Sequence, residues 1–172
     1  MNKSYNYKDF RIEILYEDSD IAILNKPSGL LTHKKNEFDE SPSLQDSLKD
    51  QFTIDDGENF KEGIVHRLDK DTSGIIVITK NLISKNKFRE MFKKRNIKKN
   101  YLAFAYGVLS QNNIEINRNI SRNKVQRTKF NISDNLGKNA ITKVSNIKIF
   151  HGSISLLAVS YTHLRAHKTN LD

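Results

Sequence analysis

Residues 63–79 read Gly-Ile-Val-His-Arg-Leu-Asp-Lys-Asp-Thr-Ser-Gly-Ile-Ile-Val-Ile-Thr, and they say more about the fold than any other stretch. Residues 74–79 are apolar and β-branched, a pattern that predicts a strand buried on both faces. The apolar residues 64–65 could end another strand. Residues 66–73 would then form a loop held between two strands, and loops on rigid scaffolds commonly carry functional side chains.

The predicted loop sets one carboxylate, Asp69, close to several basic side chains. Its neighbours His66, Arg67 and Lys70 favour the ionised form, so we expect a carboxylate at neutral pH. A carboxylate among cations can act as a nucleophile, as a general base or as an ion-pair partner. Taken alone, the residues favour ion pairing, because acidic residues in basic loops are common.

Outward from this stretch, the sequence predicts an α+β fold. Apolar runs and polar–apolar alternation predict strands at residues 11–16, 21–24, 74–79, 101–108, 141–150 and 154–160. We expect the first two strands to form a hairpin and residues 151–153 to connect the last two. Helices are predicted over 43–52 and over 82–94, the second with Asn81 as its N-cap. Together these elements predict one mixed, mainly antiparallel sheet with a few flanking helices.

Two further segments, a predicted turn and the second predicted helix, are expected to have structural roles. The run Asn25-Lys26-Pro27-Ser28-Gly29 contains strand breakers and predicts a turn whose role is shape. In the second helix, Phe88, Met91 and Phe92 form an apolar stripe that predicts core packing. The basic residues around that stripe are expected to face solvent: Lys85, Lys87, Arg89, Lys93 and Lys94.

The composition is strongly basic, with 29 Lys and Arg against 20 Asp and Glu and a net charge of +9. Such a balance attracts polyanions, but lysine enrichment also arises from compositional bias, so charge alone leaves nucleic-acid binding open. The absence of cysteine excludes disulfides and thiolate metal sites. His163 and His167 could form half a metal site, but no third ligand accompanies them, and we expect no metal.

The chain shows no sign of a membrane or export segment. No stretch approaches the roughly 20 apolar residues that a membrane helix needs. Residues 1–7 lack the apolar core of a signal peptide. We therefore expect a cytoplasmic protein that does not bind or span a membrane.

The run His-Arg-Leu-Asp-Lys-Asp-Thr-Ser-Gly at residues 66–74, followed by an apolar strand and Lys80, resembles the signature of the RluA-type pseudouridine synthases. Other segments resemble further motifs of that family in the same order, at residues 14–18, 23–30, 99–103 and 137–142. The resemblance extends from about residue 11 to residue 159. It implies the family's α+β catalytic fold and a cofactor-free isomerisation of uridine to pseudouridine in ribosomal or transfer RNA.

The resemblance also implies roles for individual residues. Asp69 would attack the nucleoside, and the detached uracil would rotate and rejoin through its carbon 5. Tyr101 matches the family's active-site tyrosine, which can stack on the uracil and exchange a proton. The target base must first leave its stack. Contact with RNA is expected from His66, Arg67, Lys70, Thr72 and Arg122. We expect the protein to act as a monomer with RNA as its partner.

The end of the chain departs from the family pattern. The family continues with Thr-Gly-Arg-x-His-Gln-Ile-Arg-x-His, whose second arginine pairs with the catalytic aspartate, whereas residues 160–167 read Ser-Tyr-Thr-His-Leu-Arg-Ala-His. One residue is lost before Arg165, so its side chain would face the other side of a strand. We therefore expect a truncated catalytic domain over 1–159 and a non-native or divergent tail over 160–172.

The departure leaves a second function open. Without its arginine partner, a buried Asp69 carboxylate would be costly and shifted towards protonation, which weakens a nucleophile. The alternative to an active synthase is a catalytically impaired RNA-binding remnant of the same fold.

Overall fold

The computed structural model describes residues 3–36, 38–55, 63–126, 129–133 and 136–161. The chain divides into two compact units, Met1–Lys94 and Arg95–Asp172. Each unit contains one antiparallel sheet. The predicted α+β class with mainly antiparallel pairing is confirmed. The expectation of a single sheet is wrong for the described residues, because their strands pair only within a unit.

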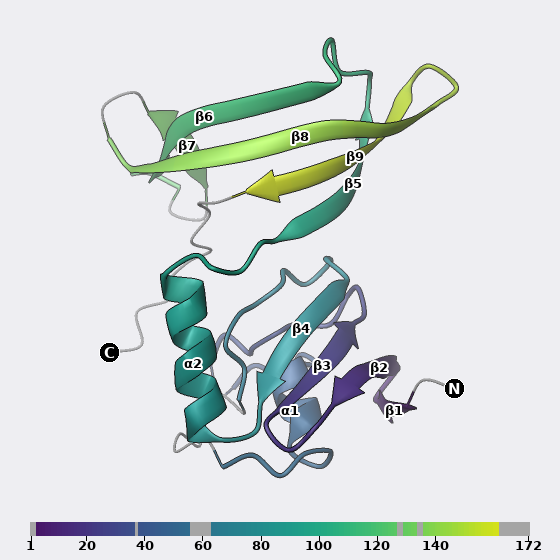
Figure 1. The fold of residues 1–172 in the computed structure, drawn as a ribbon, viewed down its shortest axis with the longest axis vertical. Coiled ribbons are helices and arrows are strands. Elements are labelled where there is room, and N and C mark those ends of the chain that lie inside the picture. Colours follow the sequence, from purple (N-terminus) through teal and green to yellow (C-terminus); the bar gives the residue numbers. More distant parts are fainter. Residues whose placement is uncertain (1–2, 37, 56–62, 127–128, 134–135, 162–172) are drawn as a thin grey trace. The chain divides into compact units, whose positions relative to one another are not determined.

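The first unit contains a sheet in the order β1-β2-β3-β4 (Figure 1). Its strands are β1 (Lys3–Tyr7), β2 (Phe10–Glu17), β3 (Ile21–Lys26) and β4 (Gly74–Thr79). The predicted hairpin of β2 and β3 is confirmed. Asp18 closes its turn, because one carboxylate oxygen accepts hydrogen bonds from the backbone N of Asp20 and of Ile21, both at 2.8 Å. Sequence patterns missed β1, a mostly polar strand at the edge of the sheet.

The pairing of β3 with β4 brings two distant parts of the chain to one end of this sheet. The antiparallel register runs from Ile21 opposite Thr79 to Lys26 opposite Gly74. The turn that follows Lys26 and the loop that precedes Gly74 therefore leave the sheet at the same end. This register is what positions the candidate site.

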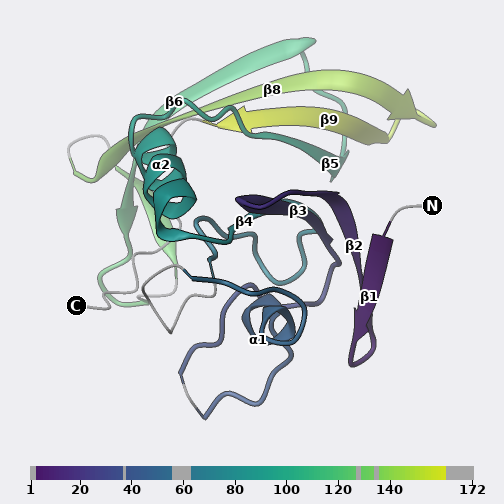
Figure 2. The ribbon, with the colours of Figure 1, turned by 60° about the horizontal axis from the view of Figure 1, so that its bottom comes forward.

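One face of the sheet carries the core of the first unit. Its fully buried side chains include Ile12, Ala22, Leu24, Ile76 and Ile78. Helix α1 (Leu44–Leu48) lies on one side of the sheet (Figure 2) and buries Leu44 and Leu48. The opposite face of β4 is less covered, since Ile75 is 61% exposed. The prediction that β4 is buried on both faces is therefore wrong for Ile75.

The two helices start where the sequence predicts. The side chain of Ser43 accepts a hydrogen bond from the backbone N of Asp46 at 3.1 Å and caps α1, which ends earlier than expected, at Leu48. The side chain of Asn81 accepts from the backbone N of Ser84 at 2.8 Å and caps α2 (Leu82–Lys93). Both caps satisfy N–H groups that a helix leaves without intrahelical partners.

One lysine of α2 is more deeply buried than predicted, whereas the apolar stripe of this helix agrees with the prediction. The stripe of Phe88, Met91 and Phe92 is half-buried, in agreement with packing. Lys85 was expected in solvent but is fully buried. Lys85 follows Ser84, whose hydroxyl donates to the backbone O of Asp20, so this side of the helix packs against the rest of the first unit.

The second unit contains a sheet in the order β5-β9-β8-β6-β7. Its strands are β5 (Asn100–Tyr106), β6 (Asn113–Arg122), β7 (Phe130–Ser133), β8 (Lys138–Phe150) and β9 (Ile154–Tyr161). The predicted strand near 101–108 and the predicted hairpin of β8 with β9 are confirmed. β6 and β7 were not predicted, because β6 is mostly polar, β7 has only four residues, and both are mostly exposed. The expected domain boundary at residue 159 falls within β9, and residues 162–172 of the expected tail lie outside the described residues.

Candidate functional site

In the loop of residues 66–73, Asp69 lies between the buried Leu68 and the exposed Lys70. Leu68 is buried and holds the loop to the first unit, whereas Asp69 and Lys70 are exposed. The backbone N of Thr72 donates to the backbone O of Asp69 at 3.2 Å and forms a turn. Among the described residues, the carboxylate of Asp69 is engaged in no hydrogen bond or ion pair. An exposed carboxylate avoids the desolvation cost expected of a buried, unpaired one.

The segment of residues 26–32, here called the turn segment, holds this loop through its backbone. The hydroxyl of Thr32 donates to the backbone O of Leu68 at 2.7 Å and accepts from its backbone N at 3.2 Å. The backbone N of Gly29 donates to the backbone O of Lys70 at 2.9 Å. The hydroxyl of Ser28 donates to the backbone O of Asp71 at 2.8 Å. Asp69 is therefore flanked on both sides by residues whose backbone is bound.

Lys26 is the charged member of the turn segment, and its side chain is fully buried. Its ammonium donates to three backbone oxygens, those of Pro27 at 2.9 Å, Leu30 at 2.7 Å and Lys70 at 3.0 Å. Burial lowers the pKa of Lys26 from its ordinary value, and the charges of Asp71 and Asp69 oppose this shift. These bonds use all three ammonium protons, so Lys26 links the turn segment to the loop.

The sequence assigned Lys26 to a turn but missed its use as a link. A signal was present in the strand alternation. Lys26 falls on the same side of β3 as the buried Ala22 and Leu24, so its side chain points towards the core. Sequence patterns also missed Thr32, because nothing local reveals that its partner is Leu68.

His66 ties the loop to its neighbours in the first unit. Its Nε2 atom accepts a hydrogen bond from the backbone N of Val77 at 2.9 Å. In the neutral ring the proton is then on Nδ1. The imidazole also packs on the ring of Phe92 in α2, with 4.9 Å between centroids. This geometry supports a structural use for His66, and its contact with RNA remains a prediction.

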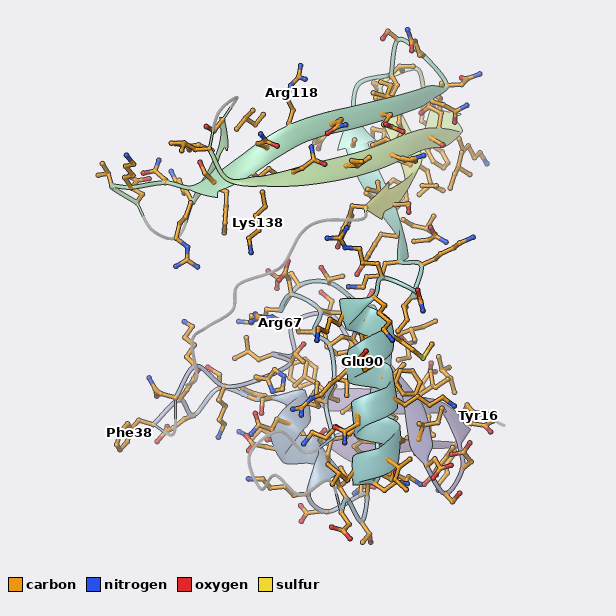
Figure 3. All side chains as sticks on the ribbon, turned by 60° about the vertical axis from the view of Figure 1, so that its left-hand side comes forward. Tyr16, Phe38, Arg67, Glu90, Arg118 and Lys138 are labelled. Carbon is orange, nitrogen blue, oxygen red and sulfur yellow. The ribbon has the colours of Figure 1, made fainter. Side chains whose placement is uncertain are left out.

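The other predicted RNA contacts of the loop differ in exposure. Arg67 and Lys70 are exposed, on either side of the pair formed by Leu68 and Asp69. Figure 3 labels the side chain of Arg67 in the first unit. Thr72 is half-buried. The loop therefore offers two cations to solvent, and these can contact phosphates. It also offers two carboxylates, since Asp71 is exposed like Asp69.

Gly63 fixes the position from which the chain enters the loop. Its φ is +72°, and a Cβ atom there would lie 1.9 Å from the backbone O of Thr79. The backbone O of Gly63 accepts from both the backbone N and the hydroxyl of Thr79, each at 2.9 Å. Only glycine combines this φ with so close an approach. The next residue, Ile64, forms an isolated bridge to Ile78 of β4 rather than the end of a strand.

Two predicted site residues lie in the second unit. Tyr101 is half-buried on β5, opposite Val159 of β9, and its ring stacks on that of Tyr161 at 5.1 Å with 7° between planes. Arg122 ends β6 and places its guanidinium over the ring of Phe130, 5.8 Å from the centroid. In this sheet β9 and β8 separate the strands of Tyr101 and Arg122. The structure thus gathers five predicted residues in one loop and sets two on separate strands of the other unit.

The described residues contain no group of three or more His, Cys, Asp or Glu side chains that could hold a metal ion. In the same part of the chain, no helix is long and apolar enough to cross a membrane. The loop of the first unit offers carboxylates and cations, and the second unit offers aromatic rings. These groups can perform nucleophilic or acid–base chemistry and can stack on a base.

Comparisons with known sequences show similarity to one protein family. A family model described as RNA pseudouridylate synthase matches residues 20–168. Ribosomal large subunit pseudouridine synthase D of Borreliella burgdorferi is 36% identical over 163 residues, covering 91% of this chain and 49% of that protein. Ribosomal large subunit pseudouridine synthase C of Rickettsia bellii is 35% identical over 159 residues, covering 92% and 51%. The chain thus spans about half the length of these curated relatives.

Two solved structures are similar in fold to this chain. Human RNA pseudouridylate synthase domain containing 1 superposes with a TM-score of 0.72 at 22% identity, covering 91% of this chain and 61% of that one. Human RNA pseudouridylate synthase domain containing 4 gives a TM-score of 0.67, also at 22% identity. At this identity the likeness shows a shared fold.

Proposed function

The chain belongs to the RNA pseudouridylate synthase family, and we propose that it converts uridine to pseudouridine within RNA with Asp69 as the nucleophile. One observation carries this proposal. Asp69 is exposed, yet the residues before and after it are bound through their backbones to the turn segment. A nucleophile held in this way needs little reorganisation to reach its target.

The proposed reaction is an isomerisation and requires no cofactor. The bond between the sugar carbon C1′ and N1 of uracil breaks, and a bond between C1′ and C5 forms. C5 loses a proton and N1 gains one, so atoms and electrons balance. The Asp69 carboxylate adds to the sugar or to the base and leaves again when the new bond has formed. Tyr101 is proposed to stack on the uracil and to move a proton.

The surrounding charges fit an RNA substrate. Arg67 and Lys70 are exposed beside Asp69 and can contact phosphates. Thr72 and His66 are further polar groups of the same loop that we propose as RNA contacts. Arg122, stacked over Phe130, is proposed as a further RNA contact from the second unit. The names of the relatives favour ribosomal over transfer RNA as the target. We further propose that the protein works as a monomer in the cytoplasm, where ribosomal RNA is found.

The test compares the natural chain with Asp69→Asn on a uridine-containing RNA tritiated at C5. Tritium release and mass spectrometry of the digested RNA measure pseudouridine formation. Asp69→Asn is expected to lower the rate by roughly 10⁶-fold, the scale seen when a nucleophile is removed, with RNA affinity within about twofold. Asp71→Asn is the matched control, an exposed carboxylate two residues along, and it should retain most of the activity.

Two other outcomes would replace the proposal. If the natural chain binds RNA but forms no pseudouridine, it is a non-catalytic RNA-binding module. If it shows no salt-dependent RNA binding at all, it is a basic structural protein of another kind.

A further inference from the structure

We infer that Thr32 is a positioning residue for Asp69, acting through the backbone of Leu68, the residue before the proposed nucleophile. The inference rests on the proposed function and adds to it a residue that no sequence motif singled out. The side chain of Thr32 is 3% exposed. Its hydroxyl donates to the backbone O of Leu68 at 2.7 Å and accepts from the backbone N of the same residue at 3.2 Å.

A hydroxyl suits this double contact because it carries one donor and two acceptor lone pairs on one atom. The loop lacks a strand partner at Leu68, so the Thr32 hydroxyl takes the place of a sheet neighbour for both backbone groups. Two bonds to one residue restrain the orientation of its backbone. The Cα of Asp69 follows directly, so its position depends on that restraint.

Thr32 is itself tied to the core of the first unit. Its backbone O accepts from the backbone N of Gln45 at 3.2 Å, and the neighbouring backbone O of Leu31 accepts from the backbone N of Leu44 at 2.7 Å. Leu31 also forms a parallel bridge with Ser43, the N-cap of α1. The connection therefore runs from the buried first turn of α1 through the Thr32 hydroxyl to Leu68 and Asp69.

The far side of Asp69 is held by a separate set of bonds. Lys26 and Gly29 both donate to the backbone O of Lys70, and neither bond involves Thr32. Loss of the Thr32 hydroxyl should therefore leave the loop attached but misplace the carboxylate. That combination predicts a variant that folds and binds RNA but turns over slowly.

The experiment compares Thr32→Val, which keeps the shape and removes the hydroxyl, with Thr32→Ser, which keeps the hydroxyl. Thr32→Val should lower kcat roughly 100-fold, the scale expected for a misplaced catalytic group, with KM for RNA within about twofold. Thr32→Ser should restore most of kcat. The matched control is Ser155→Ala, which removes a buried hydroxyl of the second unit that donates to the backbone O of Gly107 at 2.7 Å and should leave kcat nearly unchanged.

Amide hydrogen exchange of the free protein supplies a readout that needs no activity. The Leu68 amide should exchange faster in Thr32→Val and return to the natural rate in Thr32→Ser. If the natural chain forms no pseudouridine, the proposed function fails, and unchanged exchange at Leu68 would overturn the positioning role as well. If the natural chain is active and Thr32→Val keeps its kcat, the inference fails while the function stands.

A third variant covers the case in which Thr32→Val does not fold. Thr32→Cys is close to threonine in size and has a thiol that is a weak donor and a weak acceptor. It should show a smaller fall in kcat in the same direction. A folded Thr32→Cys protein with the natural kcat and the natural Leu68 exchange rate would overturn the inference.

Discussion

Lys26 shows how one residue sets the geometry beside Asp69. A buried ammonium is tolerable only where its charge is well solvated by the protein. Here the backbone oxygens of Pro27, Leu30 and Lys70 take the place of water. Removal of the ammonium would leave these oxygens without that partner. The lysine is therefore needed by the fold of the turn segment as well as by the loop.

Lys26→Met tests this role, because methionine keeps most of the side-chain stem. We expect the free energy of unfolding to fall by about 3 kcal/mol, since hydrogen bonds to a charged group contribute roughly 1.5–3 kcal/mol each and methionine packing recovers part of the loss. Urea denaturation measures the change. Lys49→Met is the control, because its exposed pair with Asp46 should contribute less than about 1 kcal/mol. Equal effects of both changes would contradict the assignment.

At the scale of elements, three strands of the first unit meet at Glu17. This residue ends β2, and its carboxylate contacts the ammonium of Lys3 in β1 and of Lys80 after β4, each at 2.7 Å. The hydrogen bonds from Lys3 and then from Lys80 lower the pKa of Glu17 from its ordinary value near 4.5. Because the folded pKa lies below the unfolded one, this contribution is present above the unfolded pKa and is lost as pH falls through the folded pKa.

Glu17→Gln should therefore change stability in a pH-dependent way. At pH 7 the variant should be less stable by roughly 0.5–1 kcal/mol, the scale of partly exposed ion pairs. The difference should shrink below pH 4.5 and vanish in stronger acid, because the natural glutamate is then neutral too. Thermal unfolding from pH 2 to 7 measures it. Glu115→Gln, which breaks a more exposed pair with Lys143, should show a smaller difference at every pH.

At the scale of the whole molecule, charge governs how the chain meets RNA. The net charge is +9, and the basic side chains are spread over both units. Lysine and arginine that neutralise phosphates release the counterions bound to RNA. Affinity for RNA should then depend on salt, whatever the identity of the target uridine.

This predicts a measurable slope. If about four phosphates of a single-stranded RNA are neutralised, affinity should fall roughly 50-fold between 50 and 200 mM salt. Fluorescence anisotropy with a labelled uridine-containing oligonucleotide measures the slope. Lys70→Gln and Arg122→Gln should each make the slope of log affinity against log salt shallower by the amount of about one phosphate contact, if these side chains touch phosphates. A slope near zero would exclude an electrostatic mode of binding.

Local patterns were sufficient wherever the physical cause is local. The alternation in β2, the apolar run of β4, and Asn81 at the start of α2 act through neighbouring residues, and the structure agrees with each. The edge strands β1 and β7 were missed because β1 is mostly polar, β7 has only four residues, and each depends on a neighbouring strand to form. Local patterns also placed Lys85 in solvent, and this prediction is wrong because its burial depends on the residues against which α2 packs.

The sequence by itself determined the candidate loop, its carboxylate at Asp69 and the family to which the chain belongs, because these depend on residue identity and spacing along the chain. Only the tertiary structure decided how the loop is held. Thr32 meets Leu68 and Lys26 meets Lys70 across long stretches of sequence, through the register of β3 with β4 and the start of α1. The partners in such contacts leave no local pattern, because the contacts form only after the strands have paired.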